Sequence, residues 1–512
     1  MKKYFFILTT TILLIVSSCT KLDEKLNGQL NPATGGAGNV NIDALLNGAY
    51  NTMRDNFQGQ GNLYALGEMT TDALIGPTRG GDWDDNGAWR VLHAHQFDAE
   101  NAHVKDVWAA LGGTQFAATD ILRFTPTAQQ AAEARLLRAY AQYLTLDLYG
   151  QVPYREPGES AVLASKVRKG TEALTYIIGE LNAIITDLPA GPVKRANKNA
   201  AKVLLMKCYL NKGVYANRAA PTFDATDMAK VSSLADEIIA GGYSFATSYF
   251  DNFAPNNDAI GKENIWTSEN VGGVSSGGIR SHWHSTMHYN QQPSGWNGFT
   301  TLSDFYNKFE ASDKRRGVAY AYTSPNAPAN PGSRVNVGFL IGQQYNMNTD
   351  AALKDRTGAP LSFTPEVKIV EKGTNLEVTG IRAYKYPIDF QFDDNGNVDN
   401  DYVYFRLGDV LLMKAEALLR SSNAAAALVI VNNLRVNRGA TALAALTLDN
   451  MIDERAREMY LENFRRQDLI RFGKFLLPMQ EKPGTSDPKY LLFPIPNSQV
   501  SGNPNLSQNP GY

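Results

Sequence analysis

The sequence predicts a mainly α-helical protein, in which tetratricopeptide-like helical hairpins pack as an α-α superhelix with a loop-rich, ring-rich insert that contains short strands. Two observations carry this prediction. Apolar residues recur at helical spacing towards both ends of the chain, and this periodicity fades over 243–404, where Gly, Pro, Asn and aromatic residues accumulate. We therefore expect an amino-terminal helical region over 41–242, a loop-rich, ligand-facing region over 243–404 and a carboxyl-terminal helical region over 405–512, all in one body.

The helical prediction rests on four segments. In EARLLRAYAQYLTLDLYG, the residues Leu137, Ala141, Leu144 and Leu148 share one helix face, and Gly150 marks the end. The segments NKNAAKVLLMKCYLNKG, YFRLGDVLLMKAEALLR and AAALVIVNNLRVNRG, which begin at positions 197, 404 and 425, show similar spacing. Helices that each bury one face need a neighbour to stack on, so hairpins are expected. In the insert, EVKIV (366–370) and IRAYKY (381–386) predict short strands.

The amino terminus predicts export. MKKYFFILTTTILLIVSSC places two lysines before an apolar run and small residues before Cys19, which is typical of a signal peptide over 1–18. The segment up to Cys19 also resembles a lipobox, so we expect Cys19 to carry a lipid anchor and 19–40 to form a flexible tether. An ordinary signal peptide with a chance cysteine is the alternative. Acylation of Cys19 would leave Cys208 without a disulfide partner, so the core must hold the fold.

The composition narrows the classes of ligand that the protein could bind. A net charge of −2 over 512 residues argues against nucleic acid or an anionic membrane surface as a partner, since both need a concentrated basic face. Aromatic residues make up 10% of the chain, with 24 tyrosines and 22 phenylalanines. An exported, nearly neutral, ring-rich protein favours uncharged ligands.

Two motifs near the carboxyl terminus resemble the SusD/RagB family of Bacteroidetes outer-membrane lipoproteins. The closing segment LLFPIPNSQVSGNPNLSQNPGY (491–512) is similar to the family's terminal signature, and IDERAREMYLENFRRQDLIRFGKF (452–475) to a second family block. The family usually has glycine where this chain has Asn463. Asparagine tolerates left-handed backbone angles better than other residues with a side chain, so we expect the turn to be kept. Segments at 67–75, 133–154 and 404–420 extend the resemblance over most of the chain.

The resemblance implies a noncatalytic lipoprotein, anchored in the outer membrane and facing the cell exterior. Such a protein lies over a SusC-like TonB-dependent transporter and hands it oligosaccharide, and it needs no cofactor. Some members of the family take peptides, so a peptide ligand stays open. A secreted glycoside hydrolase or esterase is the second alternative.

The stretch GVSSGGIRSHWHSTMHYNQQPSGW (273–296) admits three interpretations. Its G-x-S-x-G string would be a nucleophile elbow only between a buried strand and an immediately following helix. Three histidines could bind zinc if they alternate along a strand. Its rings could form a wall for a sugar, which presents C–H faces and a rim of hydroxyls. We favour the ring wall, whose predicted ligand-binding residues are Trp283, His284, Tyr289 and Trp296, and the zinc alternative would use His282, His284 and His288.

The segment TTDALIGPTRGGDWDDNGAW (70–89) is the second candidate. The resemblance implies that the loop in this block borders the glycan site, so it assigns ligand contact to Asp72, Arg79, Trp83 and Trp89. Local salt bridging in a Gly-rich turn is the alternative for the charged pair. Trp108 is predicted to be core. Two further patterns leave metal binding open without assigning it: the cluster His93, His95 and His103, and a partial calcium loop, DDNGNVDND, from Asp393 that lacks the final glutamate.

Overall fold

Helices make up most of the regular structure in the computed structural model, which describes residues 40–512. The predicted signal peptide, Cys19 and residues 20–39 of the predicted tether lie outside the described residues. The chain from Ile42 to Tyr512 clusters as one unit. The predicted fold class, mainly α with short strands, is confirmed.

The helices are α2 (Ile42–Phe57), α3 (Leu63–Glu68), α4 (Arg90–His93), α5 (Ala102–Ile121), α6 (Ala128–Tyr149), α7 (Gly170–Ile184), α8 (Lys198–Leu210), α9 (Lys212–Ala216), α10 (Ala225–Ile239), α11 (Asn257–Ile260), α12 (Ser281–His284), α13 (Ser303–Tyr306), α14 (Leu407–Arg420), α15 (Ala424–Asn437), α16 (Leu448–Met459), α17 (Arg465–Arg471) and α18 (Asn497–Gly502). The strands are β1 (Gln151–Tyr154), β2 (Lys166–Lys169), β3 (Asn264–Ser268), β4 (Gly317–Val318), β5 (Val337–Leu340), β6 (Gly342–Gln343), β7 (Ser362–Phe363), β8 (Arg382–Tyr384) and β9 (Tyr402–Arg406).

The ends of the predicted helices follow from their caps. Thr127 and Gln130 form a capping box before α6, and Gly150 ends that helix in the left-handed conformation with φ 72°. The Asn197 side chain accepts a hydrogen bond from Ala200 N at the start of α8. The segment that begins at position 404 starts as β9 and becomes helical only at Leu407, so its helix is three residues shorter than the pattern suggested.

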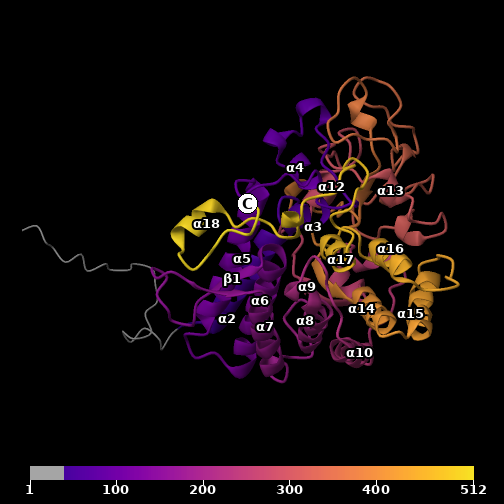
Figure 1. Ribbon diagram of the computed structural model, residues 1–512. Helices are drawn as coiled ribbons and strands as arrows, with labels where there is room; N and C mark the ends of the chain where they lie inside the picture. The colour runs from indigo at the N-terminus through magenta and orange to yellow at the C-terminus, as the bar shows by residue number, and fades with distance from the viewer. Residues whose placement is uncertain (1–39) are drawn as a thin grey trace, which may run out of the picture. The chain divides into compact units, whose positions relative to one another are not determined.

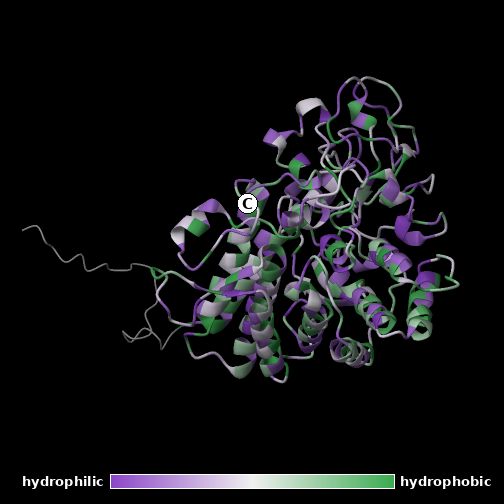
Figure 2. Cartoon of the chain, viewed as in Figure 1, coloured by the Kyte–Doolittle hydropathy of each residue, from purple (hydrophilic) through white to green (hydrophobic). Residues whose placement is uncertain are grey.

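The long helices pack against their neighbours in chain order. Helix α5 packs on α2 and α6, α8 on α10, α10 on α14, and α14 on α15. These helices occupy the lower part of Figure 1, and the loop-rich segments lie above them. Apolar and polar residues alternate around the helices in Figure 2, as expected where one face is buried. The tetratricopeptide-like regularity of these hairpins stays a prediction.

The loop-rich region contains small antiparallel sheets. Strand β3 pairs with β9, β5 lies between β4 and β8, and β6 pairs with β7. Strand β8 confirms the prediction for 381–386. The strand predicted at 366–370 is wrong, because this backbone bonds elsewhere: Thr78 N donates to Ile369 O at 3.0 Å, and Ile369 N donates to the Glu481 carboxylate at 3.1 Å.

The carboxyl-terminal tail closes over the end of α6. Asn509 Nδ2 donates to Tyr149 O at 2.9 Å and to Phe493 O at 2.7 Å. Further upstream, Asn463 has φ 68°, which confirms the expected left-handed turn, and its backbone N–H donates to the Glu68 carboxylate at 2.7 Å. Two of the motifs that resemble the family therefore join distant parts of the chain.

A buried ion cluster connects the helices to the loop-rich region. The Glu458 carboxylate, on α16, accepts hydrogen bonds from Arg315 at 3.0 Å, from Arg406 at 2.6 Å and from Arg438 at 2.8 Å. All four side chains are almost fully buried. Burial acts to raise the pKa of Glu458, but the arginine charges outweigh it and hold that pKa well below its ordinary value. The cluster is therefore ionised at neutral pH.

We expect Glu458→Ala to lower the free energy of unfolding by about 3–5 kcal/mol, because the substitution leaves buried arginines without their shared carboxylate. Denaturant unfolding followed by circular dichroism measures the change. The matched control is Glu237→Ala, which removes a carboxylate that is 52% exposed and paired with Lys202. The control should cost no more than about 1 kcal/mol. Equal losses in the two variants would contradict a structural role for the buried cluster.

Candidate ligand-binding site

Three of the predicted aromatic residues retain exposed surface: Trp83, Tyr289 and Trp296, which we call the ring cluster. Trp83 and Trp296 are 213 positions apart, yet Trp83 Nε1 donates to Trp296 O at 3.0 Å. Tyr289 lies on the same turn as Trp296. Burial raises the pKa of Tyr289, and the nearby charge of Arg356 acts to lower it. The charge of Asp82 raises it further, so Asp82 also lies near Tyr289.

The loop after α3 fixes the position of Trp83. Its backbone N–H donates to Thr78 O at 3.1 Å. The indole lies against Gly298, where an added Cβ would come within 2.5 Å of its ring carbons, and its ring centroid is 5.0 Å from that of Phe299. Only glycine at position 298 leaves room for the indole, which packs there and keeps part of its surface exposed.

The turn after α12 fixes Trp296 and Tyr289. Trp296 N donates to His284 O at 2.6 Å, and the His284 ring lies 5.4 Å from the indole. The Arg356 guanidinium lies 4.1 Å from the centre of the Tyr289 ring and binds the Glu377 carboxylate. A cation over an aromatic face is attractive, so Tyr289 is held on one side by Arg356.

His288 completes this support. Its Nδ1 accepts from Asn290 N at 3.0 Å, so Nε2 carries the proton that it donates to Glu377 at 2.9 Å. Burial lowers the pKa of His288, which keeps the ring neutral at neutral pH. The predicted zinc ligand is therefore a hydrogen-bond support for the turn.

Five predicted site residues are held by contacts within the fold, and three of them are buried rings. Trp283 is fully buried, with Nε1 donating to Asp393 at 2.8 Å, and buried His284 bonds the same carboxylate at 3.0 Å. Trp89 is 7% exposed and donates to Asp85 at 2.6 Å. None of these three rings offers an open face to a ligand from solvent. Trp108 is core, as predicted.

The two predicted charged residues, Asp72 and Arg79, are engaged in ion pairs. Asp72 accepts two 2.7 Å hydrogen bonds from Arg465, whose charge outweighs burial and lowers the Asp72 pKa. Arg79 is buried, pairs with Glu371 at 3.3 Å and donates to Gly298 O at 3.1 Å. Burial lowers the Arg79 pKa to about 10, which still leaves it charged at neutral pH. Arg79 thus holds the glycine against which Trp83 packs.

The histidines of the zinc alternatives do not converge. His282 lies on helix α12, not on a strand, and its Nε2 bonds Gln58 O at 2.7 Å. His93 and His95 bond the backbone carbonyls of the consecutive residues Thr71 and Thr70, and His103 bonds Gly61 O. Asp393, the first residue of the partial calcium loop, is occupied by Trp283, His284 and Arg280. Within residues 40–512, no three metal-ligating side chains form a metal site.

The G-x-S-x-G string also lacks the geometry of a nucleophile elbow. Ser275 lies in a short turn that is closed by a backbone bridge to Val271, and the next helix, α12, begins only at Ser281. An elbow needs its serine directly between strand and helix. An added Cβ at Gly277 would lie 2.3 Å from Arg54 O, so this glycine serves close packing.

Four residues around the ring cluster have no signal in the sequence: Arg356, Glu377, Asp82 and Gly298. Arg356 and Glu377 lie 60 or more positions beyond the turn that they support, and no local pattern points to them. Gly298 follows Trp296 by two positions, but a glycine that accommodates a ring looks like any loop glycine in sequence.

The mainly helical body thus carries a partly exposed ring cluster in its loop-rich region. The SusD family model matches residues 262–512. The starch-binding protein SusD of Bacteroides thetaiotaomicron is 29% identical over 429 residues, which cover 75% of this chain and 73% of that relative. SusD-like protein P2 of Formosa agariphila is 23% identical over the full length of both chains.

Solved structures share the fold. A SusD superfamily protein from Parabacteroides distasonis matches with a TM-score of 0.70 and 19% identity, over 92% of this chain and 98% of that one. Surface glycan-binding protein A from Bacteroides uniformis matches with a TM-score of 0.68 and 19% identity, over 91% and 98%. The chain is therefore similar to the SusD family in its carboxyl-terminal half, and it shares the fold of the SusD superfamily.

We expect Gly298→Ala to displace the Trp83 indole, because the new methyl group would overlap it, and to cost about 1–3 kcal/mol of stability. Near-ultraviolet circular dichroism of the tryptophans and thermal unfolding measure the two effects. The control is Gly112→Ala in α5, where an added Cβ meets nothing within 4 Å. A Gly298→Ala spectrum identical to that of the unsubstituted protein would refute the packing described for Trp83.

Proposed function

We propose that this protein binds a neutral oligosaccharide on the ring cluster and delivers it to a SusC-like TonB-dependent transporter of the outer membrane. The observation that carries the proposal is the hydrogen bond from the Trp83 indole to the backbone carbonyl of Trp296, which joins two partly exposed tryptophans from distant segments. Flat apolar faces suit the C–H faces of pyranose rings.

Polar groups around the ring cluster suit the hydroxyl rim of a sugar. Asp82 and Asn290 are exposed, and Arg356, although paired with Glu377, is 52% exposed in its side chain. A carboxylate and a guanidinium can both make charge-assisted hydrogen bonds to hydroxyls. Glu377 offsets the charge of Arg356, which leaves the Asp82 carboxylate as a hydrogen-bond acceptor for a hydroxyl.

The names of relatives support a glycan over a peptide. One relative is described as starch-binding and one solved structure as a laminarin-binding SusD-like protein. A peptide ligand remains the competing proposal for the same site, because aromatic residues also bind peptides. Ser275 has no elbow geometry to support an esterase.

The proposed location is the outer membrane, with the lipid anchor at Cys19. SusD family proteins are associated with that membrane. Among residues 40–512, no helix is long and apolar enough to cross a bilayer. Acyl chains on the predicted anchor would supply the attachment, since each buried methylene contributes about 0.8 kcal/mol.

We expect the double variant Trp83→Ala, Trp296→Ala to weaken oligosaccharide binding by at least about tenfold, because both stacking faces are lost. Calorimetric titration of the purified protein against plant, host and microbial glycans and a peptide digest tests this. The matched control is Phe116→Ala, which removes an aromatic ring that is 52% exposed on helix α5. Binding of peptides alone would contradict the glycan proposal, and full binding by the double variant would contradict the site.

We expect Cys19→Ser to move the protein out of the membrane fraction, because serine cannot accept the thioether-linked lipid. Fractionation of expressing cells, with immunodetection of the protein, measures the distribution. Cys208→Ser serves as the control, since Cys208 is buried in α8. Retention of the Cys19→Ser protein in the membrane fraction would be incompatible with the proposed anchor.

A further inference from the structure

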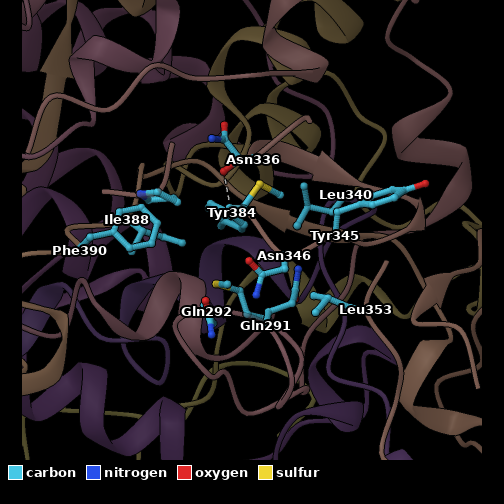
Figure 3. A pocket seen from close by; sticks show the side chains of 13 residues that line it. Gln291, Gln292, Asn336, Leu340, Tyr345, Asn346, Leu353, Tyr384, Ile388 and Phe390 are labelled. Atoms are coloured by element: carbon cyan, nitrogen blue, oxygen red, sulfur yellow. Dashed lines mark hydrogen bonds between the residues drawn. The ribbon is translucent and has the colours of Figure 1, made fainter. Parts of the chain in front are cut away.

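A pocket separate from the ring cluster lies beside the turn that carries Trp296. It is a hollow of about 450 Å³, open solvent included, between the turn, strand β5, the segment after β8 and an arm formed by residues 342–363. In Figure 3, Tyr384, Ile388 and Phe390 lie above Gln291, Gln292 and Asn346, with Leu340 to one side.

The floor of the pocket is apolar. Met287, Leu340, Tyr384 and Ile388 are at least 96% buried. The Tyr384 hydroxyl donates to Asn336 O, so its polar atom is satisfied within the protein. None of the residues that line the pocket is charged.

The mouth of the pocket has free hydrogen-bonding groups. Among the described residues, the side-chain amide of Gln292 and the Nδ2 of Asn346 have no hydrogen-bond partner, although Asn346 Oδ1 accepts from Asn348 N at 2.9 Å. Gln292 is exposed and Asn346 is half-buried. Both amides can therefore bind a polar atom at the open end of a ligand.

The apolar floor and the polar mouth together favour one class of ligand. A charged group in the pocket would lose its hydration without gaining an opposite charge, and a bare sugar would leave hydroxyls unpaired against the carbon floor. A carbon-rich, uncharged group with a polar atom at its open end satisfies both the floor and the mouth. Ester-linked acyl and aryl groups have this form.

The pocket and the ring cluster are built from the same segments. The turn contributes Met287 to the pocket and Tyr289 to the ring cluster. The arm contributes Leu353 and Met347 to the pocket, and its Arg356 lies over Tyr289. Asn290 Nδ2 donates to Lys354 O at 2.9 Å and joins the arm to the turn between the two sites.

We propose that this pocket is a second subsite, which takes an ester-linked acyl or aryl substituent of the saccharide bound at the ring cluster. This inference rests on the proposed function for the identity of the saccharide. The pocket itself can be tested without that saccharide, since a small aromatic ester alone should enter it.

The test uses methyl cinnamate as an uncharged aryl ester, with binding to the purified protein followed by saturation-transfer difference NMR. Met347→Trp and Leu353→Trp each fill the pocket from a half-buried wall position. We expect each to weaken cinnamate binding by at least about tenfold. Met479→Trp is the matched control, because Met479 is half-buried and does not line the pocket.

Two results would overturn the proposed subsite. The first is unchanged cinnamate binding by a filled variant that melts like the unsubstituted protein. The second is no cinnamate binding by the unsubstituted protein at millimolar concentration. The Trp83→Ala, Trp296→Ala protein should still bind cinnamate, so the pocket can stand if the ring-cluster proposal fails. A second arm titrates the glycan panel before and after mild alkaline deacylation. If no glycan binds more tightly in its acylated form, or if apolar peptides bind the pocket instead, the substituent assignment is overturned.

Discussion

The position of the loop-rich region depends on the buried ion cluster around Glu458. Short sheets of two or three strands supply few backbone hydrogen bonds, so other interactions must order a region that spans some 160 residues. Arg315, Arg406 and Arg438 reach the same carboxylate from the insert, from β9 and from the end of α15. Burying charges is costly unless every member is paired, and a fully paired cluster accepts few other arrangements of these segments.

The cluster is joined to the ring cluster through strand β8. Lys385, which follows β8, binds the Glu462 carboxylate and donates to Glu458 O at 2.9 Å. Within β8, Arg382 donates to Asn297 Oδ1 at 2.8 Å, and Asn297 is the residue after Trp296. Ion pairs in the core thus fix the turn whose ring lies at the surface. A site ordered before its ligand arrives loses less conformational entropy on binding.

The helices, the fold class and the carboxyl-terminal motifs could be predicted because their causes are local. A capping box, a glycine in the left-handed conformation and an apolar stripe lie within a few residues of each other. The difference between Trp283 and Trp296 could not be predicted. Both occur in one polar, glycine-containing stretch, but Asp393, 110 positions away, draws Trp283 inward, whereas Trp83 binds the backbone of Trp296. The residue types in the sequence predict a region rich in aromatic rings. Only long-range contacts decide which of these rings face solvent.

A crystal structure of the protein with the glycan that binds most tightly in titration would show directly whether the ring cluster is the binding site. We expect a sugar ring stacked on Trp83 or Trp296, with hydroxyls in hydrogen-bond reach of Asp82, Asn290 or Arg356. A glycan bound elsewhere on the protein, with both indoles free of contact, would contradict it.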